Sequence, residues 1–452
     1  MAMCSNSDAW CWPIQPRRLR AIPRLLPPIS EATRQPRPPS RRFDRSSQQR
    51  SPHHHQESAM KVGFRFLATV ALPALLAGSA LADNTIKIGN IVATSGTLKG
   101  VAEPAVVSAD IAVAEINAAG GINGKKVELV RFDTGSDPKQ ASVGARKLIQ
   151  DDGVLAILGP FSSGEASVAF NDGERLKVLM MPNSASTPGL TDNRNYAWRL
   201  TEDESKQFTR MLNSLKAHGV KMDKAAIVYI SEEVVSNASG TKLYPMIFDK
   251  LGIKYDPPIP VQYKSFDMSA QAAQILQANP DIVAIAALPE SASKVIKELR
   301  RQGYKGRIIG SQIFADPNVV ELFGPEGEGV IMAASFWKGF SPRAQAFNDT
   351  FVAAAEKRGI HKLGAHHSDA QTYDTLFLMK QIMEKAGVTG DPSKLSAERQ
   401  AVADQMKGVT FSGILGNNIC FAGHDAELPG YVIEIKDGKW TKYDEAPADP
   451  CK

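Results

Sequence analysis

The sequence lacks the motifs that mark the common classes of enzyme, and it has few cysteines. Among its 452 residues there is no G-x-S-x-G elbow, Walker loop, H-E-x-x-H or C-x-x-C motif, and there are four cysteines. After the first 82 residues no apolar segment approaches the roughly 20 residues that cross a bilayer. The missing motifs do not disprove an enzyme, but nothing in the residues indicates one, and we expect a protein that is not an enzyme and needs no metal or cofactor.

The formal net charge of +5 hides an uneven distribution of charged residues. Residues 1–59 contain ten arginines, no lysine and four acidic residues, whereas 41 basic and 44 acidic residues follow from Asp83 onward. The main part of the chain therefore has a net charge of −3, which gives no electrostatic support for binding a polyanion. We expect no nucleic-acid partner.

Residues 60–82 have the three regions of a secretory signal peptide. Met60 is followed by two basic residues, an apolar run over 66–76 and small residues at Ala80 and Ala82. The run is too short for a transmembrane helix, and the A-x-A pattern is typical of a signal-peptidase site. We expect cleavage after Ala82 and an exported protein.

A signal peptide cannot act from position 60, so the Arg- and Pro-rich residues 1–59 need a separate explanation. We interpret them as a non-native extension ahead of a true start at Met60. An Arg-rich transit peptide and a basic RNA-binding arm are the alternatives. Both leave the signal peptide unexplained, so we prefer the first interpretation.

The cysteines suggest one disulfide near the C-terminus. Cys4 and Cys11 lie in the extension, which leaves Cys420 and Cys451 as an even pair in a chain bound for an oxidising compartment. A disulfide closing a loop of roughly 30 residues would stabilise the fold by about 3 kcal/mol in the chain-entropy model. Two unpaired thiols are the alternative.

From Thr85 onward, short β-branched runs alternate with longer amphipathic stretches, which is typical of parallel sheets covered by helices. Strands are expected over residues 86–92, 127–132, 154–158, 178–181, 225–230, 259–263, 282–286, 307–309 and 330–334. Helices are expected over residues 105–119, 139–150, 205–218, 269–278 and 291–302, and later over 343–357 and 368–385. Asp437-Gly438 predicts a hairpin between residues 431–435 and 440–443. These strands are more than one open sheet with a single hydrophobic core usually contains. The pattern therefore predicts an α/β fold with two lobes.

Serine-rich segments follow two of the predicted strands. The strand ending at Leu158 precedes Gly159-Pro160-Phe161-Ser162-Ser163-Gly164, and the strand ending at Met181 precedes Asn183-Ser184-Ala185-Ser186-Thr187-Pro188. Ligands of open α/β sheets bind at this edge, where hydroxyls and first-turn N–H groups suit a carboxylate. Ordinary N-capping is the alternative, and it is the stronger interpretation when the serines are taken alone.

Several short segments between Thr85 and the tail point together to one family. They are Ile86-Lys87-Ile88-Gly89, Thr94-Ser95-Gly96, Ala114-Glu115-Ile116-Asn117, Gly120-Gly121-Ile122-Asn123-Gly124, Asp137-Pro138-Lys139-Gln140-Ala141, Gly159-Pro160, and Arg199 with Gln207. Collectively they resemble the periplasmic leucine/isoleucine/valine-binding proteins, the capture subunits of ABC importers. The resemblance implies a type I periplasmic binding fold: two Rossmann-like lobes with parallel sheets, a hinge of three crossings and a ligand cleft between the lobes.

The resemblance also divides the chain. It implies crossings near Leu200, Ser335 and Phe411. Lobe 1 then comprises residues 83–200 and 336–411, and lobe 2 comprises residues 201–335 and 412–452. We expect a monomer that interacts with permease subunits in the inner membrane.

The resemblance implies a set of ligand-binding residues. The family's carboxylate-binding hydroxyl corresponds to Ser163, and the contacts of the next loop correspond to Ser184 and Ser186. The full set of candidates is Val101, Ser162, Ser163, Ser184, Ala185, Ser186, Gln312 and Phe314. We also expect residues 232–237 and 312–314 to contribute from the other lobe.

Two positions depart from the family pattern. The acid that holds the α-ammonium group of an amino acid corresponds here to Gln312, and an aromatic lining position corresponds to Val101. An amide pairs with an ammonium group less strongly than a carboxylate does. Glu103, Glu232 and Asp316 are candidates for the replacement charge.

The resemblance implies a binding subunit of an ABC importer that captures a branched-chain or aliphatic amino acid, or a related small carboxylate. A non-amino carboxylate is the alternative, with an aromatic ring accommodated by Phe161, Phe314 and Trp337. A ligand sensor of the same fold is a further alternative. A hydrolase using Ser163 finds no base at motif spacing.

Overall fold

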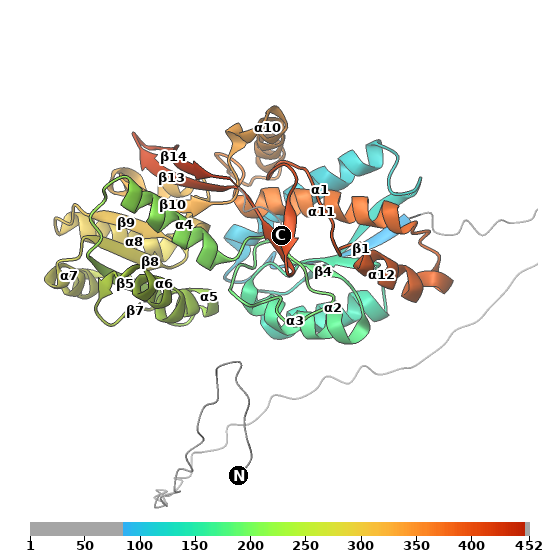
Figure 1. Cartoon of the computed structure of the whole chain (residues 1–452), viewed down its shortest axis with the longest axis horizontal. Helices are drawn as coiled ribbons and strands as arrows, with labels where there is room; N and C mark the ends of the chain where they lie inside the picture. Colours follow the sequence, from blue (N-terminus) through green and yellow to red (C-terminus); the bar gives the residue numbers. More distant parts are fainter. Residues whose placement is uncertain (1–84, 448–452) are drawn as a thin grey trace, which may run out of the picture. The chain divides into compact units, whose positions relative to one another are not determined.

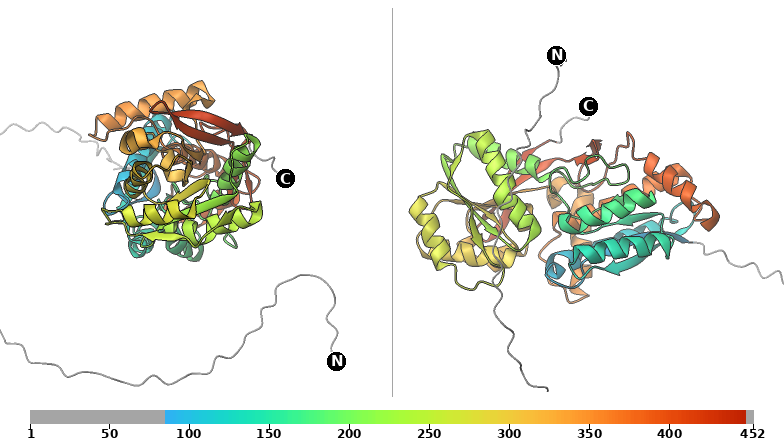
Figure 2. Two further views of the ribbon diagram at one scale, coloured as in Figure 1. Left: turned by 90° about the vertical axis from the view of Figure 1, so that its left-hand side faces the viewer. Right: turned by 90° about the horizontal axis from the view of Figure 1, so that it is seen from below.

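The computed structural model describes residues 85–447, which fold into two α/β lobes (Figure 1). One lobe contains a four-stranded sheet and the other an eight-stranded sheet. The blue-to-cyan elements lie in the first lobe and the yellow-green elements in the second, as the right view in Figure 2 also shows. The predicted fold class, two lobes built on parallel sheets, is confirmed.

The first sheet is parallel throughout and has the order β2-β1-β3-β4. Its strands are β1 (Thr85–Val92), β2 (Lys126–Asp133), β3 (Ala156–Leu158) and β4 (Met180–Met181). Its helices are α1 (Lys99–Ala118), α2 (Pro138–Gln150), α3 (Ser163–Leu176), α10 (Pro342–Glu356), α11 (His367–Ala386) and α12 (Leu395–Asp404). One apolar core joins the sheet to α1 and α11, and a second joins it to α2 and α3, so both faces are covered.

The second sheet has the order β14-β13-β10-β9-β8-β5-β6, with β7 also paired to β5. Its strands are β5 (Lys224–Ile230), β6 (Lys254–Tyr255), β7 (Ile259–Val261), β8 (Ile282–Ala286), β9 (Arg307–Gly310), β10 (Val330–Ala334), β13 (Gly430–Lys436) and β14 (Lys439–Ala446). Its helices are α4 (Glu204–Ala217), α5 (Val234–Ala238), α6 (Tyr244–Leu251), α7 (Ser269–Ala278), α8 (Pro289–Arg301) and α9 (Val319–Phe323). The strands from β5 to β10 are parallel, because helical connections return the chain to the same edge.

The strands predicted before residue 335 are all present, and so is the C-terminal hairpin. Asp437 and Gly438 have φ angles of 52° and 67°, which a two-residue hairpin turn requires. β13 and β14 therefore add an antiparallel pair to the edge of the second sheet. β6 and the small hairpin of β11 (Cys420–Ala422) and β12 (Asp425–Glu427) were not predicted from the sequence.

The chain passes between the two sheets three times: after β4, after β10 and between β12 and β13. Residues as late as Leu428 pack in the first lobe's core, and Tyr431 is the first buried residue of β13 in the second lobe's core. The crossing points near Leu200, Ser335 and Phe411, and the residue ranges of the lobes, stay predictions.

Some sequence-based predictions fall on residues that the structure does not describe. The extension, the signal peptide and Cys451 all lie outside residues 85–447. Cys420 is buried and disulfide-bonded, and its pairing with Cys451 stays a prediction. No helix within the described range combines the length and the hydropathy that a membrane span requires.

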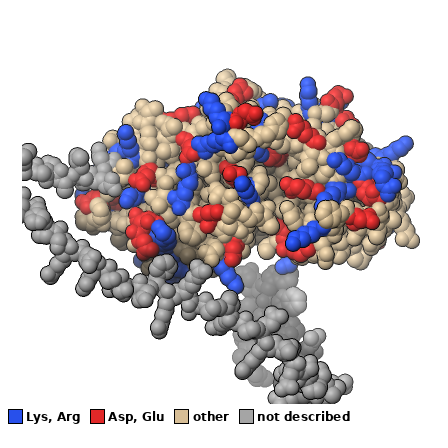
Figure 3. Space-filling model, turned by 180° about the vertical axis from the view of Figure 1, so that it is seen from behind, with Lys and Arg blue, Asp and Glu red and all other residues tan. Residues whose placement is uncertain are grey.

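Charged side chains of both signs are interspersed on the face drawn in Figure 3. Some charged side chains of the molecule pair along a helix, such as Arg301 with Glu298 at 2.6 Å and Lys380 with Glu384 at 2.6 Å. Exposed pairs of this kind contribute little to stability.

Candidate ligand-binding site

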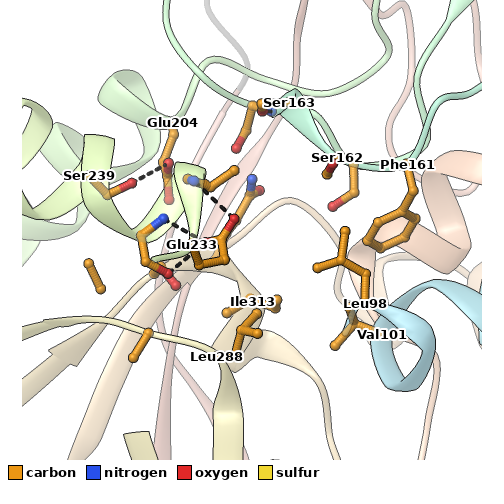
Figure 4. A pocket seen from close by; sticks show the side chains of 18 residues that line it. Leu98, Val101, Phe161, Ser162, Ser163, Glu204, Glu233, Ser239, Leu288 and Ile313 are labelled. Carbon is orange, nitrogen blue, oxygen red and sulfur yellow. Dashed lines mark hydrogen bonds between the residues drawn. The ribbon is translucent and has the colours of Figure 1, made fainter. Parts of the chain in front are cut away.

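A pocket of about 70 Å³ lies where the carboxyl ends of strands from both sheets meet. The first lobe contributes Leu98, Val101, Phe161, Ser162, Ser163, Ser184 and Ser186. The second lobe contributes Glu204, Glu233, Val235, Ser236, Ser239, Ala286, Ala287, Leu288, Ser311, Gln312 and Ile313. Figure 4 shows Phe161 and Ser162 on one side, Glu204 and Ser239 on the opposite side, and Glu233 between them. Both lobes therefore build one pocket, at the strand edge expected to bind a ligand.

The two lobes touch beside this pocket. Leu98 and Phe161 of the first lobe belong to the same apolar cluster as Leu288 of the second. A Cβ atom built on Gly164, at the start of α3, would lie 3.7 Å from Val234 of α5. The pocket is consequently bounded by contacts between the lobes as well as within them.

The loop after β3 can enter the pocket because residue 159 is a glycine. Gly159 has a φ angle of 110°, and a Cβ atom there would lie 2.1 Å from the carbonyl oxygen of Ile91. Any other residue would collide with β1. This close turn carries the chain from the strand to Phe161 and to the serines that begin α3.

Ser162 is an N-cap. Its hydroxyl accepts a hydrogen bond from the Glu165 N–H group (3.3 Å) and donates one to the Glu165 carboxylate (2.8 Å). The same carboxylate accepts from the Ser162 N–H group (3.0 Å), which completes a capping box. Although Ser162 lines the pocket, its hydroxyl hydrogen is engaged within its own helix.

Ser163 has different partners, although it is the next residue. Its Oγ atom accepts hydrogen bonds from the N–H groups of Ser186 (3.1 Å) and Thr187 (3.2 Å). A hydroxyl oxygen has two acceptor positions and one hydrogen to donate. With both acceptor positions filled, Ser163 is left with an O–H group that can donate, the arrangement that suits a ligand carboxylate.

The second serine loop is held by a buried arginine. Arg199 is 0% exposed, and its guanidinium group donates to the carbonyl oxygens of Ala185 (3.1 Å) and Thr187 (2.9 Å). Two further bonds, of 2.7 Å and 2.5 Å, join it to the carboxylate of Asp425 on β12. With its carbonyls fixed in this way, the loop presents the Ser186 and Thr187 N–H groups to Ser163.

Glu204 begins α4 directly beside this loop. Its N–H group donates to the carbonyl oxygen of Ser186 at 2.9 Å, and its carboxylate accepts a bond from the Ser239 hydroxyl at 3.3 Å. Its exposure is 2%. Burial raises the pKa of the carboxyl to about 7, and the nearby Asp203 and Glu233 add to the rise.

A π-helix over Ser239–Leu243 supplies the hydroxyl that faces Glu204. Gly240 makes this wider turn possible, because a Cβ atom there would lie 2.3 Å from Cβ of Tyr229. π-Helical turns often occur at functional sites. Here the turn carries the buried Ser239 to the pocket wall.

Glu233 is a second acid in the pocket, and it caps α5. Its carboxylate accepts bonds from the N–H groups of Val235 (3.0 Å) and Ser236 (2.7 Å) and from the Ser236 hydroxyl (2.7 Å). The acid is therefore committed to the start of its own helix, as Figure 4 shows in part.

Gln312 lies on the same side of the pocket and is 7% exposed. Its backbone N–H group interacts with Glu204. Its side-chain oxygen has no hydrogen-bond partner among the described residues. An unpaired amide oxygen at a pocket wall is an acceptor available to a ligand.

The structure brings together six of the eight candidate residues: Val101, Ser162, Ser163, Ser184, Ser186 and Gln312. Ala185 and Phe314 do not line the pocket. Ala185 is fully buried, with its carbonyl oxygen on Arg199. Phe314 lies in the core with its ring 5.3 Å from that of Phe323.

The three acids suggested as the replacement charge, Glu103, Glu232 and Asp316, do not line the pocket either. Asp316 is paired with Lys362 at 2.5 Å. Trp337 lines a separate cavity of about 230 Å³ together with Trp440. Sequence reasoning missed Glu204, because an Asp-Glu pair before a helix is an ordinary N-terminal signal.

The comparisons agree with this architecture. A family model described as periplasmic binding protein matches residues 85–439. A Leu/Ile/Val-binding protein homolog of Brucella melitensis is 28% identical over 82% of this chain and 95% of its own length.

Within residues 85–447, no cluster of three or more His, Cys, Asp or Glu side chains is arranged to hold a metal ion.

Two solved structures share the fold. The branched-chain amino acid transporter substrate binding protein LivJ of Streptococcus pneumoniae, in complex with isoleucine, has a TM-score of 0.68 and 22% identity, covering 81% of this chain and 100% of its own. A solute binding protein of Rhodopseudomonas palustris, in complex with benzoate, has a TM-score of 0.70 and 20% identity, covering 81% and 98%. Together with the family match over most of the described residues, they lead to one conclusion: this chain belongs to the periplasmic binding protein family.

Proposed function

We propose that this protein is the periplasmic capture subunit of an ABC importer and that its ligand is a small aliphatic amino acid. The observation that supports this most directly is the polarity of the pocket. Serine hydroxyls and the first turn of α3 lie on the first-lobe side, and the carboxyls of Glu204 and Glu233 lie on the second-lobe side. Within residues 85–447, no Lys, Arg or His lines it. Donors at one end and acids at the other suit a zwitterion.

The same polarity disfavours a ligand whose only charge is negative. Above about pH 7, where Glu204 is ionised, such a carboxylate would enter a pocket with two acids and no base to offset them, and like charges at short range repel strongly in a buried site. The hydroxyl groups alone would have to compensate. An α-ammonium group on the ligand removes this penalty because it supplies the missing positive charge.

The apolar wall of the pocket also favours an aliphatic ligand. It consists of Leu98, Val101, Leu288 and Ile313, with Phe161 as the aromatic residue. A branched aliphatic side chain suits these mostly aliphatic walls.

The comparisons supply the wider context of this proposal. The Brucella relative is named for leucine, isoleucine and valine, and the Streptococcus protein was solved with isoleucine. A ligand that contacts both lobes stabilises their closed arrangement, and about 5.5 kcal/mol of differential affinity moves a population from 1:99 to 99:1. We infer that permease subunits recognise the closed arrangement.

A thermal-shift panel tests the ligand class. L-Leucine, L-isoleucine and L-valine should raise the melting temperature of the purified protein, since ligand at about 100 times its Kd adds about 2.7 kcal/mol to stability. Benzoate and 4-methylpentanoate, which lack the ammonium group, serve as the comparison. A response to benzoate and none to any amino acid would reject the proposal in favour of an aromatic carboxylate.

A further inference from the structure

We propose that Glu204, and not residue 312 where the family resemblance would place an acid, receives the ammonium group of the ligand and thereby sets the preference for amino acids over their deaminated analogues. This inference rests on the proposed amino-acid function. It assigns the positive end of the ligand to a residue on a different element, the start of α4.

The position of Glu204 relative to the serines carries the first step. The α-ammonium and α-carboxylate groups of an amino acid are attached to the same carbon atom, so their binding groups must be neighbours. The Glu204 N–H group donates to the carbonyl oxygen of Ser186 at 2.9 Å, and the Ser186 N–H group donates to Ser163 Oγ at 3.1 Å. A continuous pair of hydrogen bonds thus links the acid to the hydroxyl that we assign to the ligand carboxylate.

The second step is that Glu204 has unused capacity to accept hydrogen bonds. Its two oxygens offer about four acceptor positions. They contact the Ser239 hydroxyl at 3.3 Å and the backbone N–H of Gln312. The side-chain oxygen of Gln312, which lines the same pocket, has no partner among the described residues, and Gln312 is more than nine-tenths buried. An ammonium group has three hydrogens, and this corner has acceptors for them.

Glu233 is a weaker candidate for binding the ammonium group of the ligand. Its carboxylate already accepts three hydrogen bonds from the start of α5. Turning it toward a ligand would leave two N–H groups of that helix without their cap. Its charge contributes to the field at the pocket, but its oxygens are occupied.

The groups that face Glu204 are neutral or acidic. They are Ser239 of the π-helix, Glu233 at the start of α5, Tyr244 of α6, Asp203 at the end of the preceding loop, and the Gln312 backbone. Arg199 lies 3.6 Å from Asp203 but is bound mainly to Asp425. With no cation in this set, the carboxyl retains its proton to about neutral pH, and a ligand ammonium group displaces that proton.

The test compares L-leucine with 4-methylpentanoate, which is leucine without its ammonium group, by titration calorimetry at pH 8 and pH 5.5. Leucine affinity should fall about 30-fold between these pH values, following the ionised fraction of a carboxyl with a pKa of about 7. In Glu204→Gln the pH dependence should be flat and leucine affinity at pH 8 should fall at least tenfold. Its affinity for 4-methylpentanoate should stay equal or rise.

Glu232→Gln is the matched control. This substitution removes one carboxylate, as Glu204→Gln does, at a position next to the pocket acid Glu233. Glu232 itself does not line the pocket. It should bind leucine as the unmodified protein does, with the same pH dependence.

A second measurement does not depend on the variant folding. Calorimetry of the unmodified protein near pH 7, in buffers of different ionisation enthalpy, should show release of about half a proton with leucine and uptake rather than release with 4-methylpentanoate. Leucine binding without proton release, or unchanged by Glu204→Gln, would overturn this inference and leave the proposed function standing. Absence of binding by every amino acid would instead overturn the proposed function.

Discussion

Replacing Ser163 by Ala should weaken both ligand binding and the fold, whereas replacing the adjacent Ser162 should affect the fold alone. Ser163 Oγ accepts from the N–H groups of Ser186 and Thr187 and has its own hydrogen free for a ligand. The Ser162 hydroxyl is committed to Glu165 in both directions. Two consecutive serines line one pocket, but Ser163 contributes to ligand binding and to stability, whereas Ser162 contributes to stability alone.

The magnitudes follow from these contacts. Ser163→Ala leaves two buried N–H groups without an acceptor, which should lower the free energy of unfolding by about 2 kcal/mol. It also removes a hydrogen bond to a charged group, worth about 1.5 to 3 kcal/mol, so leucine affinity should fall about 10- to 150-fold. Ser162→Ala removes a cap worth about 1 kcal/mol of stability and should leave affinity within about twofold.

Urea unfolding of the protein without ligand and calorimetric titration with L-leucine measure the two effects separately. Ser167→Ala is a suitable control, because Ser167 lies on the same helix, is exposed and bonds only to the Gly164 carbonyl in this helix. Equal losses of affinity in the Ser162 and Ser163 variants would refute the assignment, as would an unchanged affinity in Ser163→Ala.

Three further outcomes are expected. The raised pKa of Glu204 means that the folded protein holds this proton more tightly than the unfolded chain does. The stabilising contribution of the proton is therefore complete below about pH 4.5 and is lost as pH rises through 7. Measured by urea unfolding, the free energy of unfolding of Glu204→Gln minus that of the unmodified protein should rise by about 2 kcal/mol from pH 5.5 to pH 8. Arg199→Lys should lower the unfolding free energy by about 3 kcal/mol and weaken leucine binding, because lysine cannot hold both Asp425 and the loop carbonyls; equal stability would contradict this. Cys420→Ser, Cys451→Ser and the double variant should each lose about 3 kcal/mol, and additive losses would exclude the predicted pair.

Much of the architecture was predictable because buried parallel strands have a strong local signature. β8, with the sequence IVAIA, is buried at every position, and short apolar runs of this kind stand out from the amphipathic helices around them. Their carboxyl ends share an edge, so the serine loops after β3 and β4 could be placed near each other without any knowledge of side-chain packing.

The separate contributions of Ser162 and Ser163 were not predictable. Which of two adjacent serines caps a helix depends on the residue at which the helix begins, and boundaries are the least certain part of a sequence-based prediction. The Glu165 carboxylate three residues after Ser162 is the signal that identifies the capping box in retrospect.

Phe314 shows how a short turn changes the direction of a side chain. The residues after β9 form a 3₁₀ turn over Gln312–Ala315, which leaves Gln312 at the pocket and directs Phe314 into the core. Gly310 makes room for this, because a Cβ atom at that position would lie 1.9 Å from the Phe314 ring. The sequence alone does not reveal this turn, so both residues were predicted to line the site.

The position of Glu204 depends on contacts between the lobes and could not be inferred from the local sequence. A pKa raised from 4.5 to about 7 corresponds to about 3 kcal/mol against the ionised form in this buried position. At pH 8 the ligand-free protein therefore carries an ionised Glu204 at about that cost. An amino acid removes the cost with its ammonium group. A deaminated analogue can close the cleft only with Glu204 protonated, so each pH unit above 7 should lower its affinity about tenfold while amino-acid affinity stays constant.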